Sequence, residues 1–138
     1  MTRDIVILDG ARTAIGTFGG KLSSIAPTAT AAAVAVEAMK RSGVDPAQIG
    51  HVVFGHVINT EPRDMYLSRV AAVDAGIPET TPAFNVNRLC GSGAQAIVSA
   101  AQHLMLGDTD FALAGGAESM SRAPTRPNPR ASARKWAM

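Results

Sequence analysis

The residue with the clearest chemical potential is Cys90, the one cysteine of this 138-residue chain. It lies in the segment Asn87-Arg88-Leu89-Cys90-Gly91-Ser92-Gly93-Ala94, between an expected strand and an expected helix. A thiol at a helix start lies near unpaired backbone N–H groups and the positive end of the helix dipole, which favour the thiolate. Gly91 and Gly93 bring no Cβ atoms into the first turn, so a thioester could approach the sulfur closely. The segment therefore predicts a nucleophile that accepts an acyl group, with N–H groups nearby for an oxyanion.

Two other interpretations of this segment stay open. Cys90 could be a small buried side chain, the commoner state of a lone cysteine, although a glycine-rich turn offers it little burial. The run Gly91-Ser92-Gly93-Ala94-Gln95-Ala96 also matches the dinucleotide-binding fingerprint G-x-G-x-x-G/A, which would indicate an oxidoreductase domain. That fingerprint expects an acidic residue about 20 positions further on, at the end of the next strand. The available candidates, Asp108, Asp110 and Glu118, fit this place poorly.

None of the three histidines is a convincing general base for Cys90. His103 lies thirteen residues further along the same expected helix, which is about 20 Å at 1.5 Å per residue. His51 and His56 lie at the two ends of an expected strand, where a structural role is the usual one. Only His56 is near the strand end that could face the thiol.

Alternating strand and helix patterns surround this segment. The run Asp4–Leu8 predicts a buried strand, followed by a loop up to Pro27. Helices are expected at residues 28–42, 66–75 and 92–106, the first of which begins with hydroxyl caps. Further strands are expected at residues 51–57, 82–86 and 111–114. This order is typical of an α/β fold with a mainly parallel sheet and helices on its faces. The small residues of 92–106 predict a central, buried helix, and Gly115–Arg122 could line a pocket or form a turn.

Positive charge is concentrated at the C-terminal end of the sequence. Residues 125–138 contain four of the 13 Lys and Arg residues and no acidic residue, whereas 11 acidic residues outnumber the other nine basic ones. The body is therefore not expected to bind nucleic acid, and the Pro-containing basic tail is expected to be disordered. No run approaches the ~18 apolar residues of a membrane span, and the N-terminus has no secretory pattern, so a cytoplasmic location is expected. One cysteine excludes an internal disulfide and a cysteine-rich metal site, and no bound metal or cofactor is expected.

Three long segments carry a family resemblance. They are Ala11-Arg12-Thr13-Ala14-Ile15-Gly16 with Phe18-Gly19-Gly20, Val86-Asn87-Arg88-Leu89-Cys90-Gly91-Ser92-Gly93, and Gly115-Gly116-Ala117-Glu118-Ser119-Met120-Ser121-Arg122-Ala123-Pro124. In this order, and continuously over residues 3–124, they resemble the thiolase family of acetyl-CoA acetyltransferases and 3-ketoacyl-CoA thiolases. The loop Glu61–Tyr66 is most similar to bacterial β-ketothiolases that act on short and medium chains.

The resemblance implies a thiolase-like N-terminal domain over residues 1–124, with a mainly parallel mixed sheet, truncated at its C-terminal end. It implies that Cys90 takes the acyl group of an acyl-CoA as a thioester, with its backbone N–H in an oxyanion hole. The reaction would be the reversible conversion of acyl-CoA and acetyl-CoA to 3-ketoacyl-CoA and CoA, in fatty acid metabolism, by an enzyme that is homo-oligomeric when intact. In the family, a histidine of a Gly-His-Pro motif and a second cysteine come from a C-terminal half. This chain has neither, so it is expected to be an incomplete, inactive fragment or a catalytically silent remnant.

Overall fold

The computed structural model describes residues 4–124, in which three parallel strands form a sheet. The strands are β1 (His51–Gly55), β2 (Ala83–Val86) and β3 (Ala112–Gly116), in the spatial order β2-β1-β3. In this register Val52 of β1 pairs with Ala83 on one side and with Leu113 on the other. Because the strands are parallel, the segments that follow them, from residues 56, 87 and 117, all leave the same edge of the sheet.

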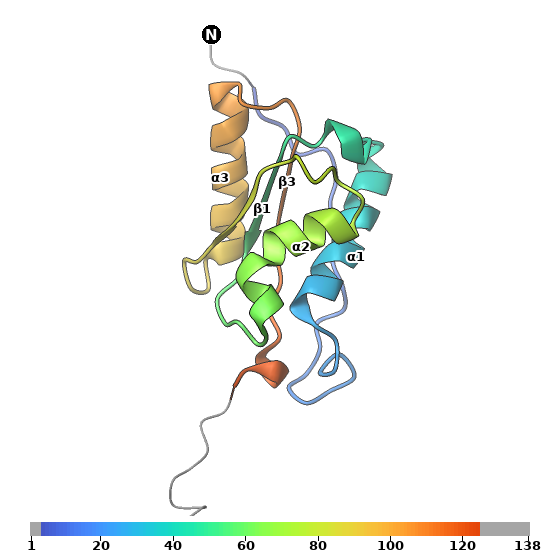
Figure 1. Cartoon of the computed structure of the whole chain (residues 1–138), viewed down its shortest axis with the longest axis vertical. Coiled ribbons are helices and arrows are strands. Elements are labelled where there is room, and N and C mark those ends of the chain that lie inside the picture. The colour runs from blue at the N-terminus through green and yellow to red at the C-terminus, as the bar shows by residue number, and fades with distance from the viewer. Residues whose placement is uncertain (1–3, 125–138) are drawn as a thin grey trace, which may run out of the picture.

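Helices cover both faces of the sheet and give three layers (Figure 1). On one face lies α3 (Ser92–Leu106), and on the other lie α1 (Pro27–Ser42) and α2 (Leu67–Asp74). Three short 3₁₀ helices occupy the connections, namely η1 (Pro46–Gln48), η2 (Pro62–Tyr66) and η3 (Met120–Arg122). The expected α/β fold with a parallel sheet and helices on both faces is therefore confirmed.

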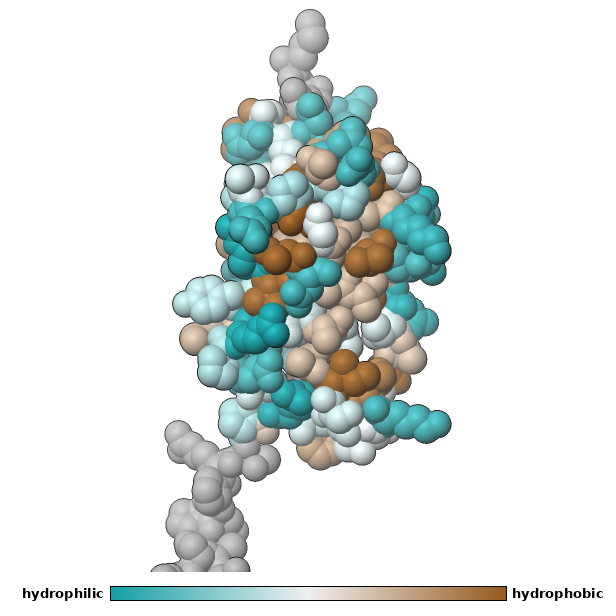
Figure 2. All heavy atoms as spheres, turned by 45° about the vertical axis from the view of Figure 1, so that its right-hand side comes forward, coloured by the Kyte–Doolittle hydropathy of each residue, from teal (hydrophilic) through white to brown (hydrophobic). Residues whose placement is uncertain are grey.

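The core is built on β1, the central strand, all of whose residues are buried. Since successive side chains of a strand point to opposite faces, Val52 and Phe54 pack against α1 and α2. Val53 points the other way and packs against Ala96 and Ala100 of α3. Apolar side chains also reach the surface, where they lie between polar ones (Figure 2).

The prediction of a buried strand at Asp4–Leu8 is wrong. The segment is not paired with any strand of the described chain, and Val6, Ile7 and Leu8 are 70%, 79% and 56% exposed. It lines one side of a hollow of about 680 Å³, and residues of β3, α1 and α3 line the other sides. A β-branched sequence favours an extended backbone, but without a neighbouring strand within about 4.8 Å it forms no ladder.

The other expected elements are present, and all but one of them have shifted ends. The expected helix at 92–106 has the same bounds as α3, but it is buried along one face only, because among the helices and strands of residues 4–124 only the strands of the sheet pack closely against it. The expected hydroxyl cap of α1 is wrong, since Ala26 precedes the helix and Pro27 begins it. Residues 125–138, expected to form a disordered tail, lie outside the described residues. Between residues 4 and 124, no helix is long and apolar enough to span a membrane.

Candidate active site

Cys90 is exposed in a tight turn between β2 and α3. The turn is closed by main-chain hydrogen bonds of 3.0 Å, in which Gly91 N–H donates to Arg88 O and Ser92 N–H donates to Leu89 O. Leu89, beside the cysteine, has a φ of 50° and is the one non-glycine residue of the described chain with positive φ. This left-handed conformation costs roughly 1–2 kcal/mol. The local structure therefore holds the thiol at the surface, and the interpretation as a buried side chain is wrong.

The hydroxyl of Ser92 stabilises this turn through two hydrogen bonds. Its Oγ accepts a hydrogen bond from Arg88 N–H at 2.8 Å and donates one to Leu89 O at 2.6 Å. Asn87 Oδ1 accepts the N–H of Leu89 at 3.1 Å, and the Arg88 guanidinium donates to Gln95 Oε1 at 2.8 Å. Every residue from 87 to 89 is thus hydrogen-bonded within the turn or to α3, which fixes the place of Cys90. In the sequence, the one feature that could have indicated that Ser92 fixes this turn is its position in the first helical turn after the cysteine.

The first turn of α3 rests directly on the ends of β1 and β3. A Cβ atom added to Gly55 would collide with the main chain of Ser92, and one added to Gly116 would lie 3.4 Å from Gly93 Cα. Because glycines at these positions permit contact between main chains, the sheet itself positions the helix start that follows Cys90.

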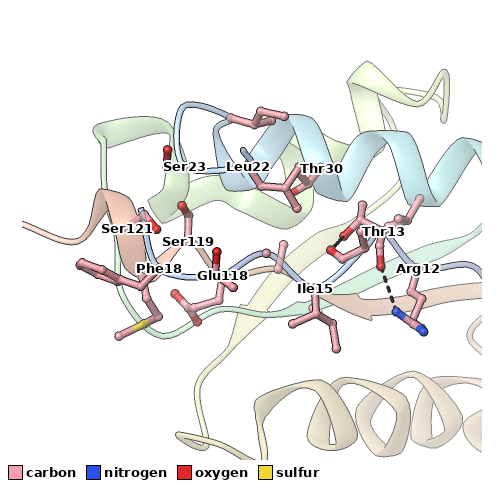
Figure 3. A pocket seen from close by; sticks show the side chains of 18 of the residues that line it. Arg12, Thr13, Ile15, Phe18, Leu22, Ser23, Thr30, Glu118, Ser119 and Ser121 are labelled. Carbon is pink, nitrogen blue, oxygen red and sulfur yellow. Dashed lines mark hydrogen bonds between the residues drawn. The ribbon is translucent and has the colours of Figure 1, made fainter. Parts of the chain in front are cut away.

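The segment that follows β3 lies beside the loop of residues 11–18, around a hollow of about 530 Å³ (Figure 3). Glu118, Ser119 and Ser121 lie on one side of it, close to Phe18 (Figure 3). Ser121 Oγ accepts the N–H of Gly19 at 2.9 Å, which joins the two segments. The sequence segment 115–122 therefore lines a hollow through residues 116–121, whereas Cys90 does not belong to its lining.

The side chain of Glu118 binds the main chain just after the end of β1. Its carboxylate accepts the N–H groups of Val57 and Ile58, both at 3.0 Å. The side chain of Arg122 donates to Ser24 O at 3.1 Å and to Glu61 Oε2 at 2.8 Å. These contacts join the segments after β1 and β3 and the loop before α1, and the sequence contained no local signal for them.

His56 is not free to act as a base on Cys90. Its side chain is 1% exposed, and its Nδ1–H donates to Ala117 O at 2.7 Å. The assignment of the proton to Nδ1 follows because a carbonyl oxygen can only accept. The other ring nitrogen, Nε2, lies 3.9 Å from Oδ2 of the buried Asp64.

The other two histidines lie together at the opposite edge of the sheet. His51 begins β1 and stacks on His103 with 3.9 Å between ring centroids, and His103 is 2.8 Å from Asp108 Oδ2. Burial, and then the proximity of His103, lowers the pKa of His51. His103 lies in the last turn of α3, so its exclusion as a base for Cys90 is confirmed.

The dinucleotide fingerprint has the right local setting but lacks its acidic partner. Gly91–Ala96 follows β2 and opens α3, as the fingerprint requires. Asp108 precedes β3 and interacts with His103, and the Glu118 carboxylate binds the main chain of residues 57 and 58. Asp110, the third candidate, also precedes β3, and the one candidate after that strand, Glu118, uses its carboxylate to bind main chain.

Comparisons with known proteins agree with one another. The thiolase N-terminal domain model matches residues 5–137. Beta-ketothiolase BktB of Cupriavidus necator is 64% identical over 124 residues, which are 90% of this chain and 32% of that protein. The crystal structure of the Bacillus anthracis acetyl-CoA acetyltransferase matches with a TM-score of 0.85 and 39% identity, over 94% of this chain and 32% of that one. Human mitochondrial 3-ketoacyl-CoA thiolase in complex with CoA matches with a TM-score of 0.82 and 36% identity, over 90% of this chain and 33% of that one.

The chain thus spans about a third of the length of these relatives. They are enzymes by name, and the comparisons give no support to the dinucleotide-binding alternative. On the family match and the shared fold together, this chain belongs to the thiolase family and has the fold of its N-terminal domain.

Proposed function

We propose that Cys90 accepts the acyl group of an acyl-CoA as a thioester, the first half-reaction of a thiolase. One observation carries the proposal. The thiol is exposed in a hydrogen-bonded turn that opens α3, at the edge of the parallel sheet where the carboxyl ends of all three strands meet. Ligands of open α/β folds bind at such an edge.

The chemistry of this step is a thioester exchange. The Cys90 thiolate attacks the carbonyl carbon of the acyl-CoA, and the electron pair of the C=O bond moves to the oxygen. The N–H groups of Gly91 and Ser92 already donate within the turn, so the backbone N–H of Cys90 itself is the group proposed to stabilise this oxyanion. When the C=O bond re-forms, the bond to the CoA sulfur breaks, and the CoA thiolate takes up the proton that Cys90 had lost. The products are S-acyl-Cys90 and free CoA.

We further propose that this chain alone does not complete the condensation of two acetyl groups. That step requires a base to remove a proton from the second acetyl-CoA, and general acid–base help contributes typically 10²- to 10⁴-fold. Within residues 4–124 the His56 ring is buried and hydrogen-bonded, and His51 and His103 stack at the far edge of the sheet. No imidazole of the described chain is therefore available to the thiol. Homo-oligomer formation and a cytoplasmic location stay predictions.

The proposal is tested by measuring CoA release when the chain is mixed with excess acetyl-CoA. Chromatography should show a burst of free CoA of about one equivalent per chain and then little further release. Cys90→Ser should abolish the burst. Absence of a burst from the wild-type chain, under conditions in which iodoacetamide labels Cys90, would instead favour a catalytically silent remnant. Continued turnover by the wild-type chain would contradict the proposed need for a further base.

A further inference from the structure

His56 contacts the ends of both other strands, although it takes no part in the chemistry proposed above. Its main-chain N–H donates to Val86 O, at the end of β2, at 3.1 Å. Its ring donates to Ala117 O, just after β3, at 2.7 Å. Ala117 N–H in turn donates to Gly55 O at 3.2 Å, so the peptide groups on both sides of Ala117 are bonded to the end of β1.

The ring of His56 is enclosed on its other side, where Nε2 makes no hydrogen bond. Asp64 lies on its other side, 3.9 Å from Nε2, and is fully buried. The Asp64 carboxylate is fixed by Thr60, whose N–H and hydroxyl both donate to Oδ2 at 2.7 Å. Since the ring lies between Asp64 and the carbonyl of Ala117, it cannot turn without losing its hydrogen bond.

The residues next to these contacts form the support of the Cys90 helix. Gly55 precedes His56 and touches the main chain of Ser92, and Gly116 precedes Ala117 and lies against Gly93. Val86, bonded to the His56 main chain, leads directly into the turn that contains Cys90. The hydrogen bond from His56 to Ala117 therefore joins the ends of β1 and β3, on which the first turn of α3 rests.

From this geometry we infer that His56 is a positioning residue for the Cys90 thiol, acting through its Nδ1–H bond to Ala117 O. It fixes the ends of β1 and β3 and through them the N–H groups at the start of α3. The inference rests on the proposed acyl transfer to Cys90 for its functional meaning, but its structural part can be measured separately.

Two substitutions separate the two ring nitrogens. In His56→Asn the amide nitrogen replaces Nδ1 and can still donate to Ala117 O, whereas in His56→Gln it replaces Nε2 and faces Asp64 instead. His51→Asn is the matched control, because His51 is a second buried histidine at the other end of the same strand. The Asn and Gln variants both place a polar amide at this buried position. The comparison between them is therefore free of the effects of an apolar side chain there.

The first measurement is amide hydrogen exchange of the 138-residue chain. His56→Gln should speed exchange of the amides of residues 88–93 by about fivefold or more, the effect of one lost hydrogen bond. His56→Asn and His51→Asn should leave these amides as protected as in the wild type, and the amides of α1 should serve as the internal reference. Equal protection of residues 88–93 in the Gln and Asn variants would overturn the inference.

The second measurement compares two reactions of Cys90. Alkylation by iodoacetamide needs only an accessible thiolate, whereas acetylation by acetyl-CoA also needs the oxyanion site. His56→Gln should slow acetylation about tenfold or more while changing alkylation less than twofold, and His56→Asn should restore acetylation. Equal slowing of both reactions would show a merely structural role and overturn the inference. If the wild-type chain is not acetylated at all, the proposed function fails, and hydrogen exchange alone decides whether His56 positions the turn.

Discussion

Gly55→Ala tests how the sheet places the nucleophile. The added Cβ would lie 2.6 Å from both Gly93 N and Ser92 O, well inside van der Waals contact. Both atoms belong to the main chain of α3, so no side-chain rotation can relieve the clash and the helix start must move. Overpacking of a well-packed site costs typically about 1–3 kcal/mol. Because only main chain can yield here, we expect a loss of unfolding free energy of about 3 kcal/mol, near the upper end of that range.

Equilibrium urea unfolding followed by far-UV circular dichroism measures this loss, with Gly93→Ala as the matched control. A Cβ on Gly93 would meet nothing within 4 Å, and alanine favours a helix over glycine by up to about 1 kcal/mol. Gly93→Ala should therefore be neutral or slightly stabilising. A Gly55→Ala variant within about 0.5 kcal/mol of the wild type would refute the direct contact between β1 and the start of α3.

Substitutions at three further residues follow from contacts near and far from the thiol. Ser92→Ala should cost about 1–3 kcal/mol in urea unfolding, because Arg88 N–H loses its acceptor and Leu89 O keeps only the N–H of residue 92; wild-type stability would show that the hydroxyl does not hold the turn. Glu118→Ala should cost about 1 kcal/mol and Glu118→Gln less, since the amide oxygen can still accept from one of two backbone N–H groups; equal losses in the two variants would contradict this role. The pKa of His51 is lowered in the folded chain, so the unfolded chain binds a proton at this residue more readily. The unfolding free energy that His51 contributes should therefore be complete above the unfolded pKa of about 6.5 and fall as the pH drops below it. His51→Asn should reduce this fall between about pH 7.5 and about pH 5.5, and an unchanged pH profile would exclude His51 as its source.

The helices and the three strands of the sheet were predictable because local signals mark their ends. Gly107 ends α3 with a φ of 80° and Gly43 ends α1 with a φ of 70°, the left-handed conformation that glycine adopts most easily. The unpaired state of Asp4–Leu8 was not predictable in the same way, because a ladder depends on a neighbouring strand that local sequence cannot reveal. Burial of α3 on one face only has the same cause, since it depends on what packs against the helix.

The site was predictable only in part, for a related reason. Cys90 was singled out from its glycine-rich surroundings at a strand-to-helix junction, and the thiol is exposed there, but its catalytic role stays a prediction. The contacts of His56 with Ala117 and of Glu118 with residues 57 and 58 join positions about 60 residues apart in the chain. Such contacts follow from the parallel register of β1 and β3, and no local spacing announces them.

Acyl transfer to Cys90 can be observed directly by mass spectrometry of the intact chain and of its peptides. After incubation with acetyl-CoA, we predict one acetyl group per chain, located on the peptide that contains Cys90 and removed by hydroxylamine as a thioester should be. The Cys90→Ser variant should not acquire a hydroxylamine-sensitive acetyl group. An unmodified wild-type chain whose Cys90 still reacts with iodoacetamide, or an adduct of the same lability that persists in Cys90→Ser, would contradict the central claim.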